Sequence, residues 1–180
     1  MDFKPGEQVL DAFSGSGAFG INAALQGAKK VISVDTSELA ISCGRNNAER
    51  NSVSNKTDSR CGTVEDCIAT DERFDLIIAN PPLLPGNPAS GLEGAVFDSG
   101  IQATIDFIKM LPDMLNRNGR CYLVTSDILE RCQFDIQELG RKNALSIKPV
   151  AQMDTDYEQY TVHRITVTPW LRVLRNVFRD

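Results

Sequence analysis

The stretch that decides the fold is Val9-Leu10-Asp11-Ala12-Phe13-Ser14-Gly15-Ser16-Gly17-Ala18-Phe19-Gly20. An apolar strand runs into three glycines with the spacing Gly15-x-Gly17-x-x-Gly20, and a helical pattern follows. Glycines at such a turn let the backbone bend tightly and approach a nucleotide-like ligand, because no Cβ stands in the way. The amides at the start of the next helix would then point at that ligand. By itself the glycine pattern also fits a dinucleotide-binding fold.

Two acids near this turn narrow the choice of ligand. Asp35 ends the second expected strand, 35 − 11 = 24 residues after Asp11, where a carboxylate can accept hydrogen bonds from both hydroxyls of a ribose, that of NAD included. Asp11 lies four positions before the first glycine, so it would repel a pyrophosphate but attract an ammonium or sulfonium group. S-adenosylmethionine carries both cations and no phosphate. The charges therefore favour S-adenosylmethionine as cofactor, with an NAD-dependent oxidoreductase as the alternative.

A second motif follows the fourth expected strand, where Phe74-Asp75-Leu76-Ile77-Ile78-Ala79 runs into Asn80-Pro81-Pro82. Pro81 keeps Asn80 extended, and the two fixed φ angles stiffen the turn. The turn offers a side-chain amide oxygen and a backbone carbonyl at the edge of the sheet where ligands of open α/β sheets bind. Two such acceptors can hold both hydrogens of a target NH₂ and orient its nitrogen for methyl transfer. We therefore predict that Asn80, Pro81 and Pro82 form the catalytic turn.

Composition sets the broad class of the protein. Its 180 residues, 42% of them apolar, suit one domain, and the net charge of −5 argues against a surface that grips phosphate backbones throughout. No apolar run approaches the roughly 18 residues of a membrane span, and the amino terminus has no apolar signal core. Five scattered cysteines and one histidine lack metal-ligand spacing. We predict a cytoplasmic protein without a metal, with mostly packed, reduced cysteines and with His163 in a strand.

Short β-rich runs alternate with helical patterns along the chain, which predicts a mostly parallel sheet with helices on both faces. The last two strands have no helix between them, so they should pair antiparallel. The expected strands are 8–13, 30–35, 56–61, 74–79, 119–125, 144–151 and 160–168. The expected helices are 18–26, 37–51, 99–116 and 127–142, with a short helical turn over 65–70 and an amphipathic tail helix over 170–180.

Together the two motifs resemble the class I S-adenosylmethionine-dependent methyltransferases, in particular the amino-methylating branch with an Asn-Pro-Pro motif. The resemblance covers roughly residues 7–168 and implies a three-layer, doubly wound α/β fold, with a seven-stranded sheet in the order 3-2-1-4-5-7-6 and strand 7 antiparallel. It implies that Asn80 and Pro81 hold the nitrogen to be methylated. The residues assigned to the cofactor are Asp11, Phe13, Gly15, Gly17, Asp35, Thr36, Asp66 and Asn80. Asp66 could equally cap a short helix.

The chain departs from that branch in two places. Leu83 stands where the branch commonly has an aromatic ring, so stacking on a nucleobase would need another residue, such as Phe97. Little precedes the first strand, so we expect a single catalytic domain over 1–180 that lacks an amino-terminal recognition segment and works with a further domain or partner subunit. The long loop 84–97, rich in glycine and proline, is assigned to the substrate mouth.

These observations predict an S-adenosylmethionine-dependent N-methyltransferase. Its acceptor is an amino or amide nitrogen of a macromolecule, either an RNA or DNA base or a protein glutamine, and no membrane is involved. Apart from the oxidoreductase, the alternative is a module with the methyltransferase fold that binds a partner without catalysis. The three-arginine stripe of Arg172, Arg175 and Arg179 and the departure at Leu83 keep that alternative open.

Overall fold

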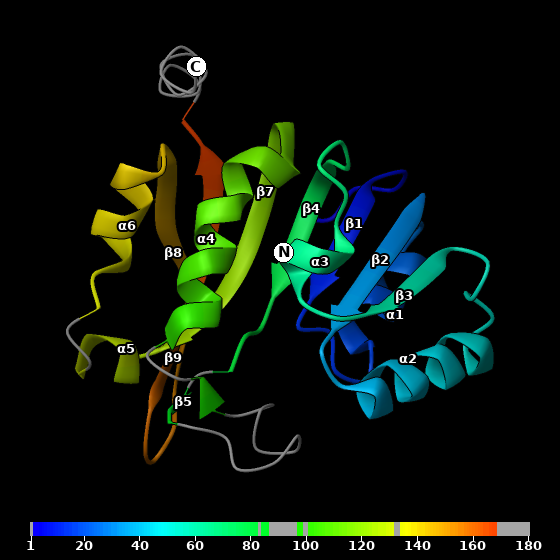
Figure 1. Ribbon diagram of the computed structural model, residues 1–180, viewed down its shortest axis with the longest axis horizontal. Coiled ribbons are helices and arrows are strands. Elements are labelled where there is room, and N and C mark those ends of the chain that lie inside the picture. The colour runs from blue at the N-terminus through cyan, green and yellow to red at the C-terminus, as the bar shows by residue number, and fades with distance from the viewer. Residues whose placement is uncertain (1, 83, 87–96, 99–100, 132–133, 169–180) are drawn as a thin grey trace. The chain divides into compact units, whose positions relative to one another are not determined.

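The structure, a computed structural model, describes residues 2–82, 84–86, 97–98, 101–131 and 134–168. Backbone contacts divide the chain into two compact units, residues 1–80 (unit 1) and residues 81–180 (unit 2). Both units contain helices and strands, as the ribbon in Figure 1 shows. No helix among the described residues is long and apolar enough to cross a bilayer.

Unit 1 alternates strand and helix as the sequence predicts. Its strands are parallel and pair in register, with Ala12 opposite both Val34 and Ala79. The carboxyl ends of β1, β2 and β4 therefore meet at one edge. The strands are β1 (Gln8–Ala12), β2 (Lys30–Asp35), β3 (Thr57–Cys61) and β4 (Phe74–Ala79), and the helices are α1 (Ala18–Leu25), α2 (Glu38–Arg50) and α3 (Val64–Cys67).

Side-chain caps fix where two helices of unit 1 begin. Ser37 precedes α2, and its hydroxyl accepts a hydrogen bond from the amide of Ala40. Thr63 does the same for α3 through the amide of Asp66. Such caps satisfy amides that have no partner inside the helix. The apolar runs of β1 and β4 are almost wholly buried, which accounts for the core of this unit.

Unit 2 contains the antiparallel part of the fold. β9 (Gln159–Val167) pairs antiparallel with both β7 (Leu115–Ser126) and β8 (Leu145–Asp154), as predicted. The helices are α4 (Gln102–Met114), α5 (Ile128–Arg131) and α6 (Ile136–Lys142), and a parallel pair of two-residue strands comprises β5 (Leu84–Pro85) and β6 (Phe97–Asp98). The rest of the predicted substrate loop, 87–96, and the predicted tail helix, 170–180, lie outside the described residues.

The strand order of the large sheet is β3-β2-β1-β4-β7-β9-β8. The short β5 and β6 belong to a separate two-stranded sheet. Counted without them, β7, β8 and β9 are the fifth, sixth and seventh strands. The predicted order 3-2-1-4-5-7-6 with an antiparallel seventh strand is therefore confirmed.

Three expectations need correction. The single helix predicted over 127–142 is two helices, because the side chain of Asp135 accepts from the amides of Gln137 and Glu138 and so starts α6 anew. The fifth strand starts at Leu115 rather than 119, directly after α4. The prediction that the cysteines are mostly packed is partly wrong: Cys121 is buried and Cys67 is half-buried, whereas Cys43 and Cys61 are exposed. His163 does lie in a strand, β9.

Candidate functional site

The predicted cofactor residues lie along the carboxyl edge of unit 1. Phe13, Asp35 and Asn80 each stand at or one position beyond the paired ends of β1, β2 and β4. Thr36 follows Asp35 and is exposed. The register therefore brings residues that are far apart in the sequence to one edge, which is where open α/β sheets bind their ligands.

The glycine turn has the backbone that its sequence predicts. Phe13, Gly15 and Gly17 have φ angles of 58°, 52° and 79°, all in the left-handed region. The amide of Gly17 donates to the carbonyl of Ser14 at 2.8 Å and closes the turn. A Cβ built at Gly15 meets no atom within 4 Å. The backbone at Gly15 is therefore open to an approaching ligand, and Phe13 is a non-glycine residue held in a strained conformation, as occurs at ligand sites.

Asp35 ties this turn to the end of β2. Its Oδ2 accepts from the amide of Gly15 at 2.8 Å, and its Oδ1 accepts from the amide of Ser37 at 2.9 Å. The residue is half-buried. Each carboxylate oxygen has a second lone pair, so both could still accept from a pair of ribose hydroxyls. The backbone contacts fix the direction in which those acceptors point.

Asp11 has a different environment from the one its sequence position suggests. It is only 1% exposed, and its Oδ2 accepts from the amide of Gly20 at 2.8 Å. Burial raises the pKa of Asp11 from 3.8 to about 7; the Gly20 hydrogen bond lowers it and the charge of Asp35 raises it further. One amide that we expected to face a ligand, that of Gly20, is therefore taken by Asp11. The carboxylate therefore supports the glycine turn through Gly20 and presents no exposed oxygen to a ligand.

The third glycine allows the first turn of α1 to lie against the strands. A Cβ at Gly20 would stand 2.9 Å from Asp11 Oδ2, 2.9 Å from a methyl of Val31 and 3.0 Å from the hydroxyl of Ser33. Side-chain carbons essentially never come so close to such atoms. Gly20 is thus required for close contact of helix and strand, one of the roles of glycine in nucleotide-binding turns.

Asp66 lies in the first turn of α3, after the end of β3, and hydrogen-bonds to Thr63, the residue that caps this helix. Its carboxylate accepts from the hydroxyl of Thr63 at 2.7 Å, while its amide donates to the same hydroxyl at 3.1 Å. The alternative that we kept open, an acid that takes part in capping a short helix, therefore describes its contacts. Asp66 is exposed, so its proposed hydrogen bond to an adenine stays a prediction.

The Asn-Pro-Pro turn lies where unit 1 ends and unit 2 begins. Asn80 is exposed, Pro81 is buried and Pro82 is half-buried. All three follow β4 directly and belong to neither a helix nor a strand. Leu83 and the side chain of Phe97 lie outside the described residues, so the question of an aromatic neighbour stays a prediction.

Sequence reasoning missed two residues of α2 that support the glycine turn. Asn47 donates from Nδ2 to the carbonyl of Ser16 at 3.0 Å. Gly44 lies against the backbone of Ser16 and Gly15, where an added Cβ would make contacts of 3.7 to 3.8 Å. Their spacing of three places both on one face of a helix, which was the available signal.

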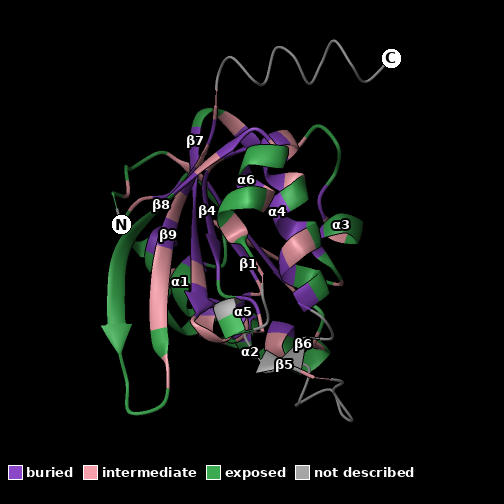
Figure 2. Ribbon diagram, turned by 90° about the vertical axis from the view of Figure 1, so that its left-hand side faces the viewer, coloured by how far each residue is buried: buried purple, intermediate pink, exposed green. Residues whose placement is uncertain are grey.

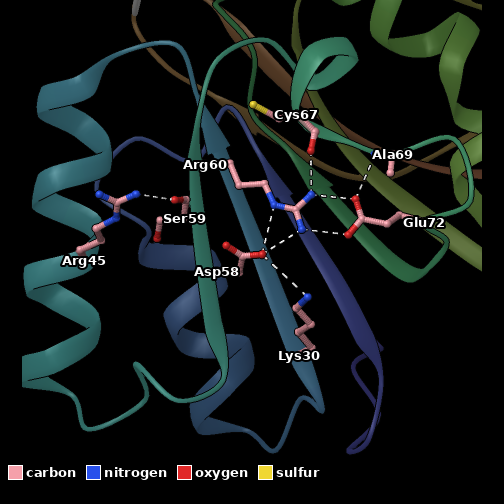
Figure 3. A network of polar contacts seen from close by, with 8 residues as sticks. All are labelled: Lys30, Arg45, Asp58, Ser59, Arg60, Cys67, Ala69 and Glu72. Atoms are coloured by element: carbon pink, nitrogen blue, oxygen red, sulfur yellow. Dashed lines mark hydrogen bonds and ion pairs between the residues drawn. The ribbon is translucent and has the colours of Figure 1, made fainter.

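A charged network on β3 braces the segment that carries α3 (Figure 3). Arg60 forms ion pairs with Glu72 at 2.7 Å and with Asp58 at 2.8 Å, and it donates to the carbonyl of Cys67 at 2.7 Å. The hydrogen bonds from Arg60 lower the pKa of Glu72 to about 2. The network joins β3 to both ends of the segment between α3 and β4, and so supports the position of Asp66.

These groups fit S-adenosylmethionine. The half-buried carboxylate of Asp35 suits the ribose, and the open backbone at Gly15 leaves room beside it. Asp35 and Asp66, together with the ionised form of Asp11, supply negative charge. This charge suits a cofactor with an ammonium and a sulfonium group better than one with a pyrophosphate.

Comparison with known proteins supports this assignment. The family model of the ribosomal protein L11 methyltransferases (PrmA) matches residues 1–82. The ribosomal protein L11 methyltransferase of Ruminiclostridium cellulolyticum is 36% identical over 143 residues, which are 79% of this chain and 39% of that protein. The ribosomal RNA large subunit methyltransferase I of Serratia proteamaculans is 36% identical over 89 residues, 45% of this chain and 22% of that protein. The chain thus spans well under half the length of these curated relatives.

A further relative and two solved structures agree. A Methanocaldococcus jannaschii protein described as an N5-glutamine methyltransferase is 30% identical over 128 residues, 68% of this chain and 63% of that protein. The ribosomal protein L11 methylase of Lactobacillus delbrueckii has the same fold, with a TM-score of 0.66 at 22% identity over 90% of this chain and 71% of that one.

The other structure, described as a methyltransferase complexed with S-adenosylhomocysteine, has a TM-score of 0.66 at 19% identity over 89% of this chain and 45% of that one. The named relatives are methyltransferases of ribosomal RNA, of ribosomal protein L11 and of protein glutamine. Together with the solved structure that holds S-adenosylhomocysteine, they support S-adenosylmethionine as the cofactor of this chain. In sequence and in fold, the chain belongs to the class I S-adenosylmethionine-dependent methyltransferases.

Proposed function

We propose that this protein transfers the methyl group of S-adenosylmethionine to an amino or amide nitrogen of a macromolecule, with Asn80, Pro81 and Pro82 as the catalytic turn. The observation that carries the proposal is the position of Asn80. It is exposed at the end of buried β4, on the same edge of unit 1 as Asp35 and the glycine turn. Cofactor contacts from Asp11, Phe13, Gly15, Gly17, Asp35, Thr36, Asp66 and Asn80 are part of the proposal.

Asn80 has the chemistry that nitrogen methylation needs. Its side-chain oxygen and its backbone carbonyl are two acceptors, enough to bind both hydrogens of an NH₂ group. Held in that way, the nitrogen lone pair has one direction left to point. Because the amide lone pair is otherwise delocalised, hydrogen bonds that strengthen as positive charge develops on the nitrogen lower the barrier. Pro81 restricts Asn80 to the extended region and so fixes the direction of both acceptors.

The cofactor, when bound, supplies a methyl group on a positively charged sulfur. The new bond joins that carbon to the acceptor nitrogen, the carbon–sulfur bond breaks, and the nitrogen loses one proton to water. Asn80 cannot accept that proton, so its role is to position and stabilise. Orienting the two reacting groups in this way removes a large part of the activation free energy of a displacement between them.

The first test separates cofactor binding from catalysis. Isothermal titration with S-adenosylhomocysteine should show binding in the micromolar range or tighter. Asp35→Ala should weaken it by about 10- to 100-fold, since hydrogen bonds to a charged group are worth roughly 1.5–3 kcal/mol. The matched control is Asp71→Ala at an exposed position. No binding by the intact protein would refute the proposed cofactor site.

The second test addresses Asn80. Asn80→Ala should bind S-adenosylhomocysteine almost as the wild type does and lose at least about 100-fold in kcat, the scale seen when a group that stabilises transition-state charge is removed. Asn55→Ala, at an exposed turn of unit 1, is the matched control and should keep full turnover. If Asn80→Ala retains kcat, the residue has no part in catalysis.

The acceptor is proposed as RNA or protein, on the basis of relatives that include an RNA methyltransferase and protein methyltransferases. A tritiated-methyl assay on cell lysate, divided between nuclease and protease digestion, would identify the class. The proposal treats residues 1–180 as one catalytic domain that works with a further recognition segment or subunit. Cofactor binding without transfer to any amine or amide would instead favour the non-catalytic module.

A further inference from the structure

Unit 2 contains a cavity of about 560 Å³ that neither the glycine turn nor the Asn-Pro-Pro turn explains. This volume lies within the range of small-molecule sites. The cavity lies between the antiparallel strands and the segment of α5 and α6. Its lining residues are Thr125, Ser126, Asp127, Leu129, Phe134, Asp135, Ile136, Gln137, Pro149, Gln152, Gln159, Thr161 and His163.

The strand register explains why this cavity is polar. Cross-strand partners share one face of a sheet, and Thr125 pairs with Thr161, which pairs with Gln152. On this face of the sheet, these polar residues lie next to the apolar positions of the same strands. Beyond them β8 is exposed over most of its length, as the colouring in Figure 2 shows. Hydroxyl and amide side chains thus replace aliphatic ones in the part of the sheet that the helices no longer cover.

The floor of the cavity holds an unusual group, the imidazole of His163. The residue is 8% exposed, and its Nε2 lies 2.9 Å from the hydroxyl of Thr125. The other ring nitrogen, Nδ1, is buried and has no hydrogen-bond partner among the described residues. A buried polar atom without a partner destabilises the fold by about 1–3 kcal/mol. Because His163 also lines the cavity, the unpartnered nitrogen points to a partner that would enter from there.

The contacts of His163 indicate what that partner offers. Burial lowers the pKa of His163, so the ring is neutral and has one donor and one acceptor nitrogen. The hydroxyl of Thr125 can donate to the carbonyl of Thr161 at 3.5 Å, and Nε2–H then donates to Thr125. In that arrangement Nδ1 is an acceptor, and its partner is an N–H or O–H group.

The charged groups of the lining disfavour an anion. Asp127 accepts from Arg131 and from the amide of Gln159, and Asp135 caps α6. Among the described residues that line the cavity there is no lysine or arginine. A phosphate or carboxylate would therefore meet the carboxylates of Asp127 and Asp135, and the nearby cation, Arg131, is already paired with Asp127. The ligand that fits is uncharged.

The remaining side chains suit a flat ring with a hydrogen-bonding edge. Gln137, Gln152 and Gln159 are exposed carboxamides, each of which can donate and accept. Phe134 is half-buried and provides an aromatic ring. Thr125 and His163, which line the same cavity, are buried. An aromatic ring for stacking and polar groups that hydrogen-bond the base edge are what recognition of an unpaired nucleobase uses.

We propose that this cavity is a second ligand site, which binds an uncharged nucleobase with its nucleoside sugar and pairs one N–H of the base with Nδ1 of His163. The ligand can be a free nucleoside or an unpaired base of an RNA strand whose phosphates stay outside the cavity. The site stands independently of the proposed methyl transfer.

Ligand binding at this cavity can be measured directly by NMR, because His163 is the single histidine of the chain and its ring nitrogens give the only imidazole signals in a ¹⁵N spectrum. The full chain is first saturated with S-adenosylhomocysteine, so that adenosine cannot report binding in unit 1. Adenosine, guanosine, cytidine and uridine are then titrated in turn. At least one should shift the Nδ1 signal of His163 with a saturable curve, and its 5′-monophosphate should bind at least about fivefold more weakly because of the two nearby carboxylates.

Two variants test the contacts without removing the histidine. Phe134→Leu and Gln152→Ala should each weaken nucleoside binding by about 5- to 30-fold, the scale of one stacked base or one hydrogen bond. Gln26→Ala, an exposed glutamine of unit 1, is the matched control and should leave the titration unchanged. Unchanged thermal midpoints and unchanged S-adenosylhomocysteine binding exclude misfolding as the cause.

A short unstructured RNA oligonucleotide distinguishes the two sources. Tighter binding than the free nucleoside, with the same Nδ1 shift, assigns the site to an RNA base, and the reverse order assigns it to a free nucleoside. If none of the nucleosides nor the RNA shifts the Nδ1 signal, no nucleobase pairs with His163 and the proposal is wrong. Loss of S-adenosylhomocysteine binding would instead count against the proposed function.

Discussion

The substitution Asp11→Asn tests how the floor of the candidate cofactor site balances stability against charge. Asp11 is buried and accepts from the amide of Gly20 at 2.8 Å. Asparagine has nearly the same shape, and its side-chain oxygen can accept the same hydrogen bond. The substitution therefore removes the charge and leaves the contact. It isolates the free energy that the fold loses by holding a carboxylate away from water.

The size of the effect follows from the pKa of Asp11, which burial raises from 3.8 to about 7. The folded state binds more protons at this group than the unfolded state between those two values, so stability falls as the pH rises through that window. At 1.36 kcal/mol for each pKa unit, the loss amounts to as much as about 4 kcal/mol by pH 8. The asparagine variant has no such loss. Its advantage should be small at pH 4 and grow to several kcal/mol at pH 8.

Urea denaturation at pH 4.5, 6, 7 and 8, at constant ionic strength, measures this difference. The matched control Asp71→Asn, at an exposed position, should differ from wild type by less than about 0.5 kcal/mol at each pH. A constant offset between Asp11→Asn and wild type across this range would refute the reasoning, because it would mean that Asp11 does not titrate there.

Asp11→Asn should weaken cofactor binding, although it stabilises the fold. Above its pKa of about 7, Asp11 is negatively charged and favours a sulfonium, which S-adenosylmethionine has and S-adenosylhomocysteine lacks, so both ligands are compared at pH 8. Asp11→Asn should therefore weaken S-adenosylmethionine by about tenfold more than S-adenosylhomocysteine, the equivalent of one pKa unit of coupling. Equal losses for the two ligands would show that the charge of Asp11 does not act on the sulfonium.

Three further substitutions test the supports of the site. Gly20→Ala places a Cβ 2.9 Å from Asp11 Oδ2 and should destabilise unit 1 by about 1–3 kcal/mol, a loss that denaturant unfolding measures. Arg60→Met should cost about 2 kcal/mol at pH 7, and this gap should narrow as the pH falls from 4.5 towards the lowered pKa of Glu72, about 2. Ser37→Ala removes the cap of α2 and should lower stability by about 1 kcal/mol in the same assay.

Much of the fold could be predicted because local patterns and topology rules determine it. The run into Gly15-x-Gly17-x-x-Gly20 specified a strand, a turn with left-handed residues and a helix, and all three are present. The lack of a helix between the last two strands required an antiparallel pair, which follows from chain length alone. The division of 127–142 into two helices was missed, although Asp135 carries the capping side chain that causes it.

The sequence by itself determined which residue types stand at the carboxyl edge: the glycine turn, Asp35 and Asn80. Only the tertiary structure decided what each can do, because burial and hydrogen-bond partners depend on packing between segments that are distant in the chain. Asp11 has the predicted position at the end of β1, but packing buries its carboxylate and the amide of Gly20 donates to its oxygen. The unpartnered nitrogen of His163 was equally invisible in the sequence, because it arises where three strands and two short helices leave a cavity unfilled.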